Sequence, residues 1–366
     1  MFYFKLIIAI AAIVAGVDRL LGGKLGIGKE FERGFTLWGA MALSMIGMIV
    51  LAPWLAKIMS PLFEFIAEKT PFDPSIVPAS LFANDMGGAT LSMEVASDEL
   101  MGRFNAFVVS SMMGCTISFT LPFSLGLVKK ERLPQLCLGL LSGTVTIPIG
   151  CFVSGLMLGV PVGALCLDLL PLIVIAAVIA FGLIKAPALC VKIFRIFGFI
   201  VKALILVGLA IGMLEFLTKD EATPIRILDD PNGYADGAMV CVNAATVLAG
   251  MFPIFAVLSR VLRRPLAVLG NKLGINDASA LGLLGNLATN ATTFGMFDKM
   301  DDNGAIINSA FSVSAAFVFG GHMAYTMAYC EEMLPYVIVG KLISGVCALA
   351  VAAFVAKKHA ASTEKI

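Results

Sequence analysis

A short polar stretch, LFANDMGGATLSMEVA (residues 81–96), carries side chains suited to bind a small solute. Its candidate ligands are Asn84, Asp85, Thr90 and Glu94. A carboxylate attracts a cation, whereas an amide or a hydroxyl both donates and accepts hydrogen bonds. Gly87 and Gly88 are able to interrupt a helix at this point, which would turn the backbone beside the ligands. We expect Asp85 to line a solute pathway, while Glu94 either shares that task or belongs to a solvated acidic rim.

A second polar stretch, LLGNLATNATTFGMFD (residues 283–298), presents amides and hydroxyls instead of acids. Its candidate ligands are Asn286, Thr289 and Asn290. Such groups also join membrane helices by hydrogen bonds, so each of them has a structural alternative. We interpret the cluster as a whole as part of the pathway.

One histidine, His322, lies in the apolar stretch FGGHMAY (residues 319–325). A neutral imidazole hydrogen-bonds a solute or relays a proton, and the alternative is a packing role. Further along the chain, kinks are expected where a proline interrupts an apolar segment, because proline removes a helical hydrogen bond. We assign kinking or gating to Gly87, Gly88, Pro122, Pro148 and Pro253.

Catalysis has little support in the sequence. The chain contains no HExxH, GxGD, GxSxG or Walker A motif, so we expect neither an enzyme nor a nucleotide-driven pump. Its net charge of +1 gives no reason to expect a nucleic-acid partner, and its eight scattered cysteines look like packing residues rather than metal ligands. We expect no cofactor and no metal.

The polar stretches are set in a very apolar chain. The 366 residues are 59% hydrophobic and 14% charged, which indicates an all-α polytopic membrane protein. We predict spans near 3–22, 35–60, 102–127, 133–159, 165–186, 197–217, 237–260, 305–329 and 333–356. The segments 74–96 and 276–297 are too polar for plain spans, so we interpret them as discontinuous or re-entrant helices.

The charges of the loops orient the chain. Cationic loops occur at 18–33, 129–132, 185–195, 260–264 and 357–359, and acidic loops at 218–236 and 331–332. With the cationic set in the cytoplasm, nine segments cross, the N-terminus lies outside and the C-terminus inside. This path requires that both polar segments return to the side from which they entered.

The chain also contains an internal repeat. Similar stretches begin at 47 and 250, at 84 and 286, at 105 and 309, and at 131 and 332, a nearly constant separation. The loop at 129–132 is basic and its counterpart at 330–333 is acidic, so equivalent loops face opposite sides. We therefore expect two inverted-topology repeats, 1–160 and 191–366, joined by a linker helix within 161–190.

Three stretches together resemble a known family. ANDMGGATLSMEVA (83–96), SGTVTIPIGC (142–151) and MFDKMDDNGAIINSAFSVSAAFVFGGHMAY (296–325) are similar to the ethanolamine-utilisation permease family, EutH. The likeness runs from VDR (17–19) to VGKLISG (339–345). The resemblance implies a multi-pass protein of the bacterial cytoplasmic membrane that takes up ethanolamine for breakdown in a microcompartment.

Ethanolamine is a small ammonium with one hydroxyl. We expect Asp85, with or without Glu94, to attract the ammonium, and Asn84, Asn286, Asn290 or His322 to bind the hydroxyl. A membrane potential, negative inside, draws such a cation inward by about 2.3 kcal/mol per 100 mV, so a facilitator or channel needs no coupling ion. The alternatives are a proton- or sodium-coupled transporter, and a membrane scaffold or sensor for ethanolamine metabolism.

Oligomeric state has only a weak signal. Small residues in GAMALSMIGM (39–48) and LAIGMLEF (209–216) suit close helix packing, within one protomer or between two. We keep a homodimer as a hypothesis.

Overall fold

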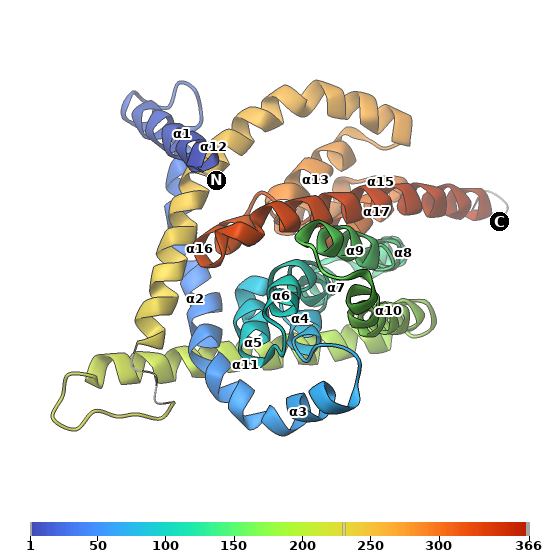
Figure 1. Ribbon diagram of the computed structural model, residues 1–366. Coiled ribbons are helices and arrows are strands. Elements are labelled where there is room, and N and C mark those ends of the chain that lie inside the picture. Colours follow the sequence, from blue (N-terminus) through green and yellow to red (C-terminus); the bar gives the residue numbers. More distant parts are fainter. Residues whose placement is uncertain (1, 229, 231, 364–366) are drawn as a thin grey trace.

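The computed structural model describes residues 2–228, 230 and 232–363, and these residues form helices and loops without any strand (Figure 1). The first half contains α1 (Phe2–Leu20), α2 (Gly28–Ile58), α3 (Ser60–Lys69), α4 (Ile76–Leu81), α5 (Gly88–Val95), α6 (Glu99–Arg103), α7 (Leu121–Leu127), α8 (Leu133–Thr144), α9 (Ile147–Leu158) and α10 (Val162–Lys185). The second half contains α11 (Pro187–Thr218), α12 (Gly233–Leu273), α13 (Asp277–Ala288), α14 (Asn290–Gly295), α15 (Asp302–Ser314), α16 (Gly321–Tyr329) and α17 (Leu334–Thr363).

Among the described residues, seven helical segments are long and apolar enough to cross a membrane, which confirms the prediction of a polytopic membrane protein. They are Gly28–Ile58, Glu99–Leu127, Lys130–Leu158, Val162–Lys185, Pro187–Thr218, Gly233–Leu266 and Glu331–His359. Large apolar side chains such as Phe181 on α10 and Phe199 on α11 point outward, as lipid contact requires. The predicted span at 305–329 is wrong as a single helix, because α15 ends at Ser314 and α16 begins only at Gly321.

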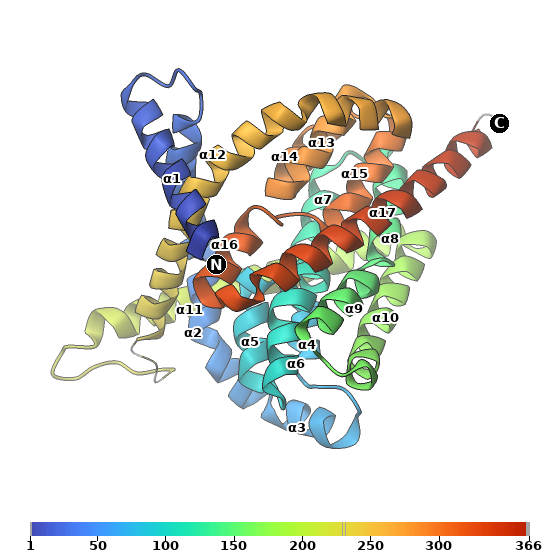
Figure 2. The ribbon, with the colours of Figure 1, turned by 45° about the horizontal axis from the view of Figure 1, so that its top comes forward.

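Four long helices stand together beside the polar segments. α2 packs along α12 and is crossed by α11, and α1 packs against α12 (Figure 1). The crossing of α2 and α11 depends on glycine, because a Cβ atom on Gly47 would overlap the carbonyl oxygen of Ile205, and one on Gly208 would overlap that of Gly47. α12 runs along α2 and then turns to continue above α13 (Figure 2).

Both polar segments are helices broken in the middle that fold back on themselves. In the first hairpin (residues 76–95), α4 and α5 pack together and the hydroxyl of Ser92 donates to the carbonyl of Ser75 at 3.1 Å. In the second hairpin (residues 277–295), the hydroxyl of Thr293 on α14 donates to the carbonyl of Gly282 on α13 at 2.8 Å. The interruptions expected within 74–96 and 276–297 are therefore present.

Each hairpin is closed at its base by a side chain. The carboxylate of Asp73 accepts the backbone N–H groups of Ser97 and Asp98, both at 3.0 Å. At the second hairpin the backbone N–H of Asn276 donates to Asp301 at 2.9 Å. Because a hairpin held at its base points its tip away, both tips extend into the helical core.

Irregular helices receive the two tips. Phe104–Gly114 (η2) and Thr116–Thr120 (η3) form a π-helix, a widened form that is rare and frequently occurs at functional sites. The break between α15 and α16 contains Phe317 at φ +63°, in the left-handed region. Its backbone N–H donates to the carbonyl of Asn286 at 3.0 Å, so the second hairpin satisfies part of the broken helix.

The prolines assigned to kinks lie at helix breaks or bends. Pro122 is in the first turn of α7, directly after the π-helix, and Pro148 is in the first turn of α9, after the interruption that separates α8 from α9. Pro253 lies inside α12. Their positions agree with kinking, and whether any of them gates a pathway stays a prediction.

Candidate functional site

The tip of the first hairpin presents a carboxylate to α16. Asp85 lies on a 3₁₀ turn (Asn84–Met86), and Gly87 follows at φ +95°, a conformation that favours glycine and reverses the chain. The Asp85 side chain is 21% exposed, and its Oδ1 atom lies 3.8 Å from Nε2 of His322. It faces the first turn of α16, whose unpaired N–H groups favour a negative charge.

His322 is buried between Asp85 and a lysine. Its exposed fraction is 2%, and its Nδ1 atom lies 3.2 Å from Nζ of Lys341 on α17. Lys341 is fully buried, and its ammonium also donates to the backbone carbonyl of Ser111 in the π-helix at 2.6 Å. Asp85, His322 and Lys341 thus form a row of charged and polar groups inside the protein.

Lys341 was missed by the sequence reasoning. The available signal was a single lysine within the apolar span predicted at 333–356, since a charge inside a membrane segment is costly and indicates function by default. The row could not be found from spacing alone, because its three members come from the 3₁₀ turn Asn84–Met86, α16 and α17.

The tip of the second hairpin presents one amide to the same π-helix and another to α15. Asn290 donates from Nδ2 to the hydroxyl of Thr120 at 3.1 Å, and Asn286 donates to the carbonyl of Asn308 at 3.3 Å. Between the two amides the chain is extended at Thr289, whose hydroxyl caps α14 by accepting the N–H of Ala291. α16 lies between the two hairpins (Figure 2).

Several buried amide atoms near the tips have no hydrogen-bond partner within the described part of the chain. Both the oxygen and the nitrogen of the Asn84 amide lack such a partner, and so do the Oδ1 atoms of Asn286 and Asn290. All three side chains are fully buried. Because buried polar groups are normally paired, such atoms require an explanation, and a polar solute or water is one.

Two further predicted ligands lie elsewhere on the first hairpin. The hydroxyl of Thr90 donates to the carbonyl of Gly87 at 3.4 Å, a local contact within the turn. Glu94 is exposed near the far end of α5, an eight-residue helix about 12 Å long, so the structure does not bring it to Asp85. Glu94 lies instead at the end of α5 that is close to the hairpin base.

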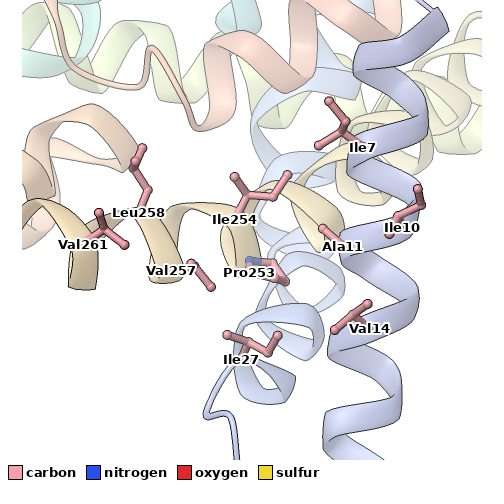
Figure 3. A pocket seen from close by; sticks show the side chains of 10 residues that line it. All are labelled: Ile7, Ile10, Ala11, Val14, Ile27, Pro253, Ile254, Val257, Leu258 and Val261. Carbon is pink, nitrogen blue, oxygen red and sulfur yellow. The ribbon is translucent and has the colours of Figure 1, made fainter.

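The cavities differ in chemistry. A groove of about 470 Å³ between α1 and α12 is lined only by apolar side chains, among them Ile7, Pro253 and Val261 (Figure 3), and it offers nothing to bind an ammonium. Another cavity, of about 510 Å³, reaches the first hairpin, because Met86 and Ser118 line it. The hydroxyl of Ser118 accepts the backbone N–H of Ala83 at the hairpin tip.

Comparisons with known proteins agree with this architecture. The family described as "Ethanolamine utilisation protein, EutH" matches residues 3–355. "Probable ethanolamine permease EutH" of Listeria monocytogenes is 39% identical over 352 residues, which cover 96% of this chain and 93% of the relative. The proteins of the same name from Escherichia coli and Salmonella typhimurium are each 36% identical, covering 100% of this chain and 96% of the relative. No solved structure matches. The chain therefore belongs to the EutH family of ethanolamine utilisation proteins.

Proposed function

We propose that this protein takes up ethanolamine across the bacterial cytoplasmic membrane, as a facilitator or channel driven by the substrate gradient and the membrane potential. The observation that carries the proposal is the partly exposed carboxylate of Asp85, placed at a hairpin tip inside a membrane protein and facing His322. Three relatives are named probable ethanolamine permeases, and these names support the substrate. Membership of a permease family implies a transporter rather than an enzyme.

The binding site follows from the chemistry of the substrate. Asp85 binds the ammonium by a charge-assisted hydrogen bond, and the buried amides at the two tips or the imidazole of His322 bind the hydroxyl. The unpartnered atoms of Asn84, Asn286 and Asn290 support this assignment, because a bound solute would complete their hydrogen bonds. Thr90 and Thr289 shape the two tips, and Glu94 attracts the cation toward the hairpin base.

The proposed topology has the two hairpins entering from opposite faces. Among the described residues, four ion pairs join segments that are distant in sequence: Lys5–Glu331, Arg103–Glu332, Lys129–Asp298 and Arg132–Asp302. The first two pairs lie on the side that the charge rule places outside, and the last two lie on the side that it places in the cytoplasm. This agreement supports the path in which both hairpins re-enter.

Two inverted repeats, 1–160 and 191–366, with the linker helix inside 161–190, are part of the proposal. Residues at nearly equivalent positions make similar contacts at the two hairpin bases, although Asn308 lies one residue before the position that the sequence repeat pairs with Asn105. Asp98 and Asp301 cap α6 and α15. Asn105 and Asn308 reach back to the beginning of their own hairpins, at 3.0 Å to Ser75 and 2.8 Å to Ser279. These paired contacts support the repeat suggested by the sequence.

Uptake of labelled ethanolamine into proteoliposomes tests the proposal. We expect uptake above that of empty vesicles, which increases when a potential negative inside is imposed. If the purified protein gives no uptake, the transport proposal fails and a scaffold or sensor becomes the better assignment. If uptake requires an imposed proton or sodium gradient and ignores the potential, the protein is a coupled transporter.

A homodimer is also part of the proposal. The small residues of α2 and α11 that suggested it do not support it, because they are used within one protomer. Gly47 and Gly208 pack α2 against α11 within one protomer, and Gly212 packs against Val50 of α2. Light scattering of the purified protein in detergent measures the mass of the particle, and a monomeric mass would end this part of the proposal.

A further inference from the structure

We infer that Lys341 is a positioning residue that holds His322 in the tautomer with its proton on Nε2, and that this N–H selects substrates carrying a hydroxyl. The inference rests on the proposed function, because it names the group that distinguishes ethanolamine from a plain alkylamine at the Asp85 site.

The tautomer follows from the donor inventory. The ammonium of Lys341 has three N–H donors and no acceptor. It lies 2.6 Å from the carbonyl of Ser111 and 3.2 Å from Nδ1 of His322. Because an ammonium only donates, we assign the contact as a hydrogen bond from Nζ of Lys341 to a proton-free Nδ1; the competing tautomer would have an Nδ1–H that donates to the Ser111 carbonyl. The ring proton then resides on Nε2.

No carboxylate competes for this lysine within the described residues. Among these residues, no carboxylate oxygen forms an ion pair or a hydrogen bond with Lys341, and Asp85 forms its close contact with His322 instead. The surroundings of Lys341 thus leave its N–H groups to the helix carbonyl and the imidazole.

The Nε2–H faces the proposed substrate. Nε2 lies 3.8 Å from Oδ1 of Asp85, too far for a direct hydrogen bond, so its proton is not consumed by that carboxylate. When the ammonium group of ethanolamine is bound to Asp85, the hydroxyl of the same molecule lies two carbons away. Its oxygen then accepts the hydrogen bond from the Nε2–H of His322. An alkylamine without the hydroxyl leaves this buried donor unpaired, which disfavours its binding.

The ring is held in place by its other neighbours. The ring of Phe317 lies 4.9 Å from the imidazole between centroids, and His322 is in the first turn of the short helix α16. Since packing fixes the ring and Lys341 fixes the proton, the direction of the donor is set before the substrate arrives. Such preorganisation favours selectivity.

Nuclear magnetic resonance tests the tautomer directly. The chain has two histidines, so His359→Gln leaves His322 as the sole imidazole signal. In ¹⁵N-histidine-labelled protein in liposomes we expect a proton-free Nδ1 and a protonated Nε2. A protonated Nδ1 overturns the inference, whatever the transport result.

Substrate discrimination tests the consequence. Inhibition of labelled ethanolamine uptake is compared for unlabelled ethanolamine and ethylamine, and we expect the wild type to prefer ethanolamine about tenfold. Lys341→Met keeps the length of the side chain without its N–H groups, and we expect the preference to fall toward one. Lys341→Gln, which retains donors, should restore part of it.

The outcomes separate the two proposals. If the wild type takes up no ethanolamine, the proposed function fails. If it does, and folded Lys341→Met keeps the wild-type preference, the positioning role fails. Should both lysine variants fail to fold, His322→Gln and His322→Leu replace them. The amide of the glutamine keeps an N–H donor, so His322→Gln should keep the preference for ethanolamine over ethylamine. His322→Leu has no donor and should lose that preference. Equal preferences in these two variants overturn the inference.

Discussion

The carboxylate of Asp85 and the imidazole of His322 lie 3.8 Å apart, where the tip of the first hairpin meets the first turn of α16. One side chain can hold the ammonium of ethanolamine and the other its hydroxyl, so the pair matches the two ends of the substrate.

Asp85→Asn should weaken ethanolamine binding, because the substitution removes the charge while keeping the shape of the side chain. Losing a hydrogen bond between charged groups costs about 2 kcal/mol, or roughly a 30-fold rise in the substrate concentration for half-maximal uptake. Initial rates of uptake in proteoliposomes measure it. Glu94→Gln is the matched control: its exposed position predicts a much smaller effect. Equal effects of the two substitutions would make Glu94 a partner of Asp85 rather than a rim residue.

Asn84→Ala should reduce uptake while costing little stability, since no protein group in the described structure pairs with this amide. Asn308→Ala removes the same atoms from an equally buried side chain, but it breaks hydrogen bonds to Ser279 and Gly304. The Asn308 variant should therefore be less stable than the Asn84 variant by about 2 kcal/mol. Thermal unfolding in detergent provides the comparison. An Asn84 variant that is as unstable as the Asn308 variant would argue for a structural role.

Gly87→Ala should destabilise the first hairpin. A side chain at φ +95° costs about 1–2 kcal/mol, and a Cβ atom there would also crowd Met48. Gly39→Ala is the control, because Gly39 lies within α2 with open space around it and alanine favours a helix. We expect a lower unfolding temperature and lower uptake only for the Gly87 variant. The left-handed turn would prove dispensable if both variants behaved like the wild type.

The two hairpin bases should be accessible from opposite faces of the membrane. Ser97→Cys and Lys299→Cys place exposed thiols at the first and second bases, in a background whose eight native cysteines are replaced. A membrane-impermeant maleimide should label the first thiol in intact cells and the second only after permeabilisation. Labelling of both from one side contradicts the inverted arrangement of the hairpins.

The sequence by itself determined the class of the protein and most of its helices. Hydropathy located the long spans because each apolar side chain contributes independently to the transfer free energy. The glycines and amides within 74–96 and 276–297 located the two interruptions, since those residues disfavour a continuous apolar helix. Asp85 and His322 stood out for the same reason, as polar groups inside apolar segments.

Only the tertiary structure decided which of these groups meet. The break between α15 and α16 covers the apolar stretch AAFVF (315–319) and Gly320, and of these residues only the glycine disfavours a helix. It exists because the N–H groups of Phe317 and Phe319 bond to the carbonyls of Asn286 and Leu287 on the second hairpin. Similarly, the lysine in VGKLISG became part of the site only when α17 carried it to Ser111 and His322. Local composition reports the cost of each residue in lipid, whereas a binding site depends on distances between segments that the chain brings together only when it folds.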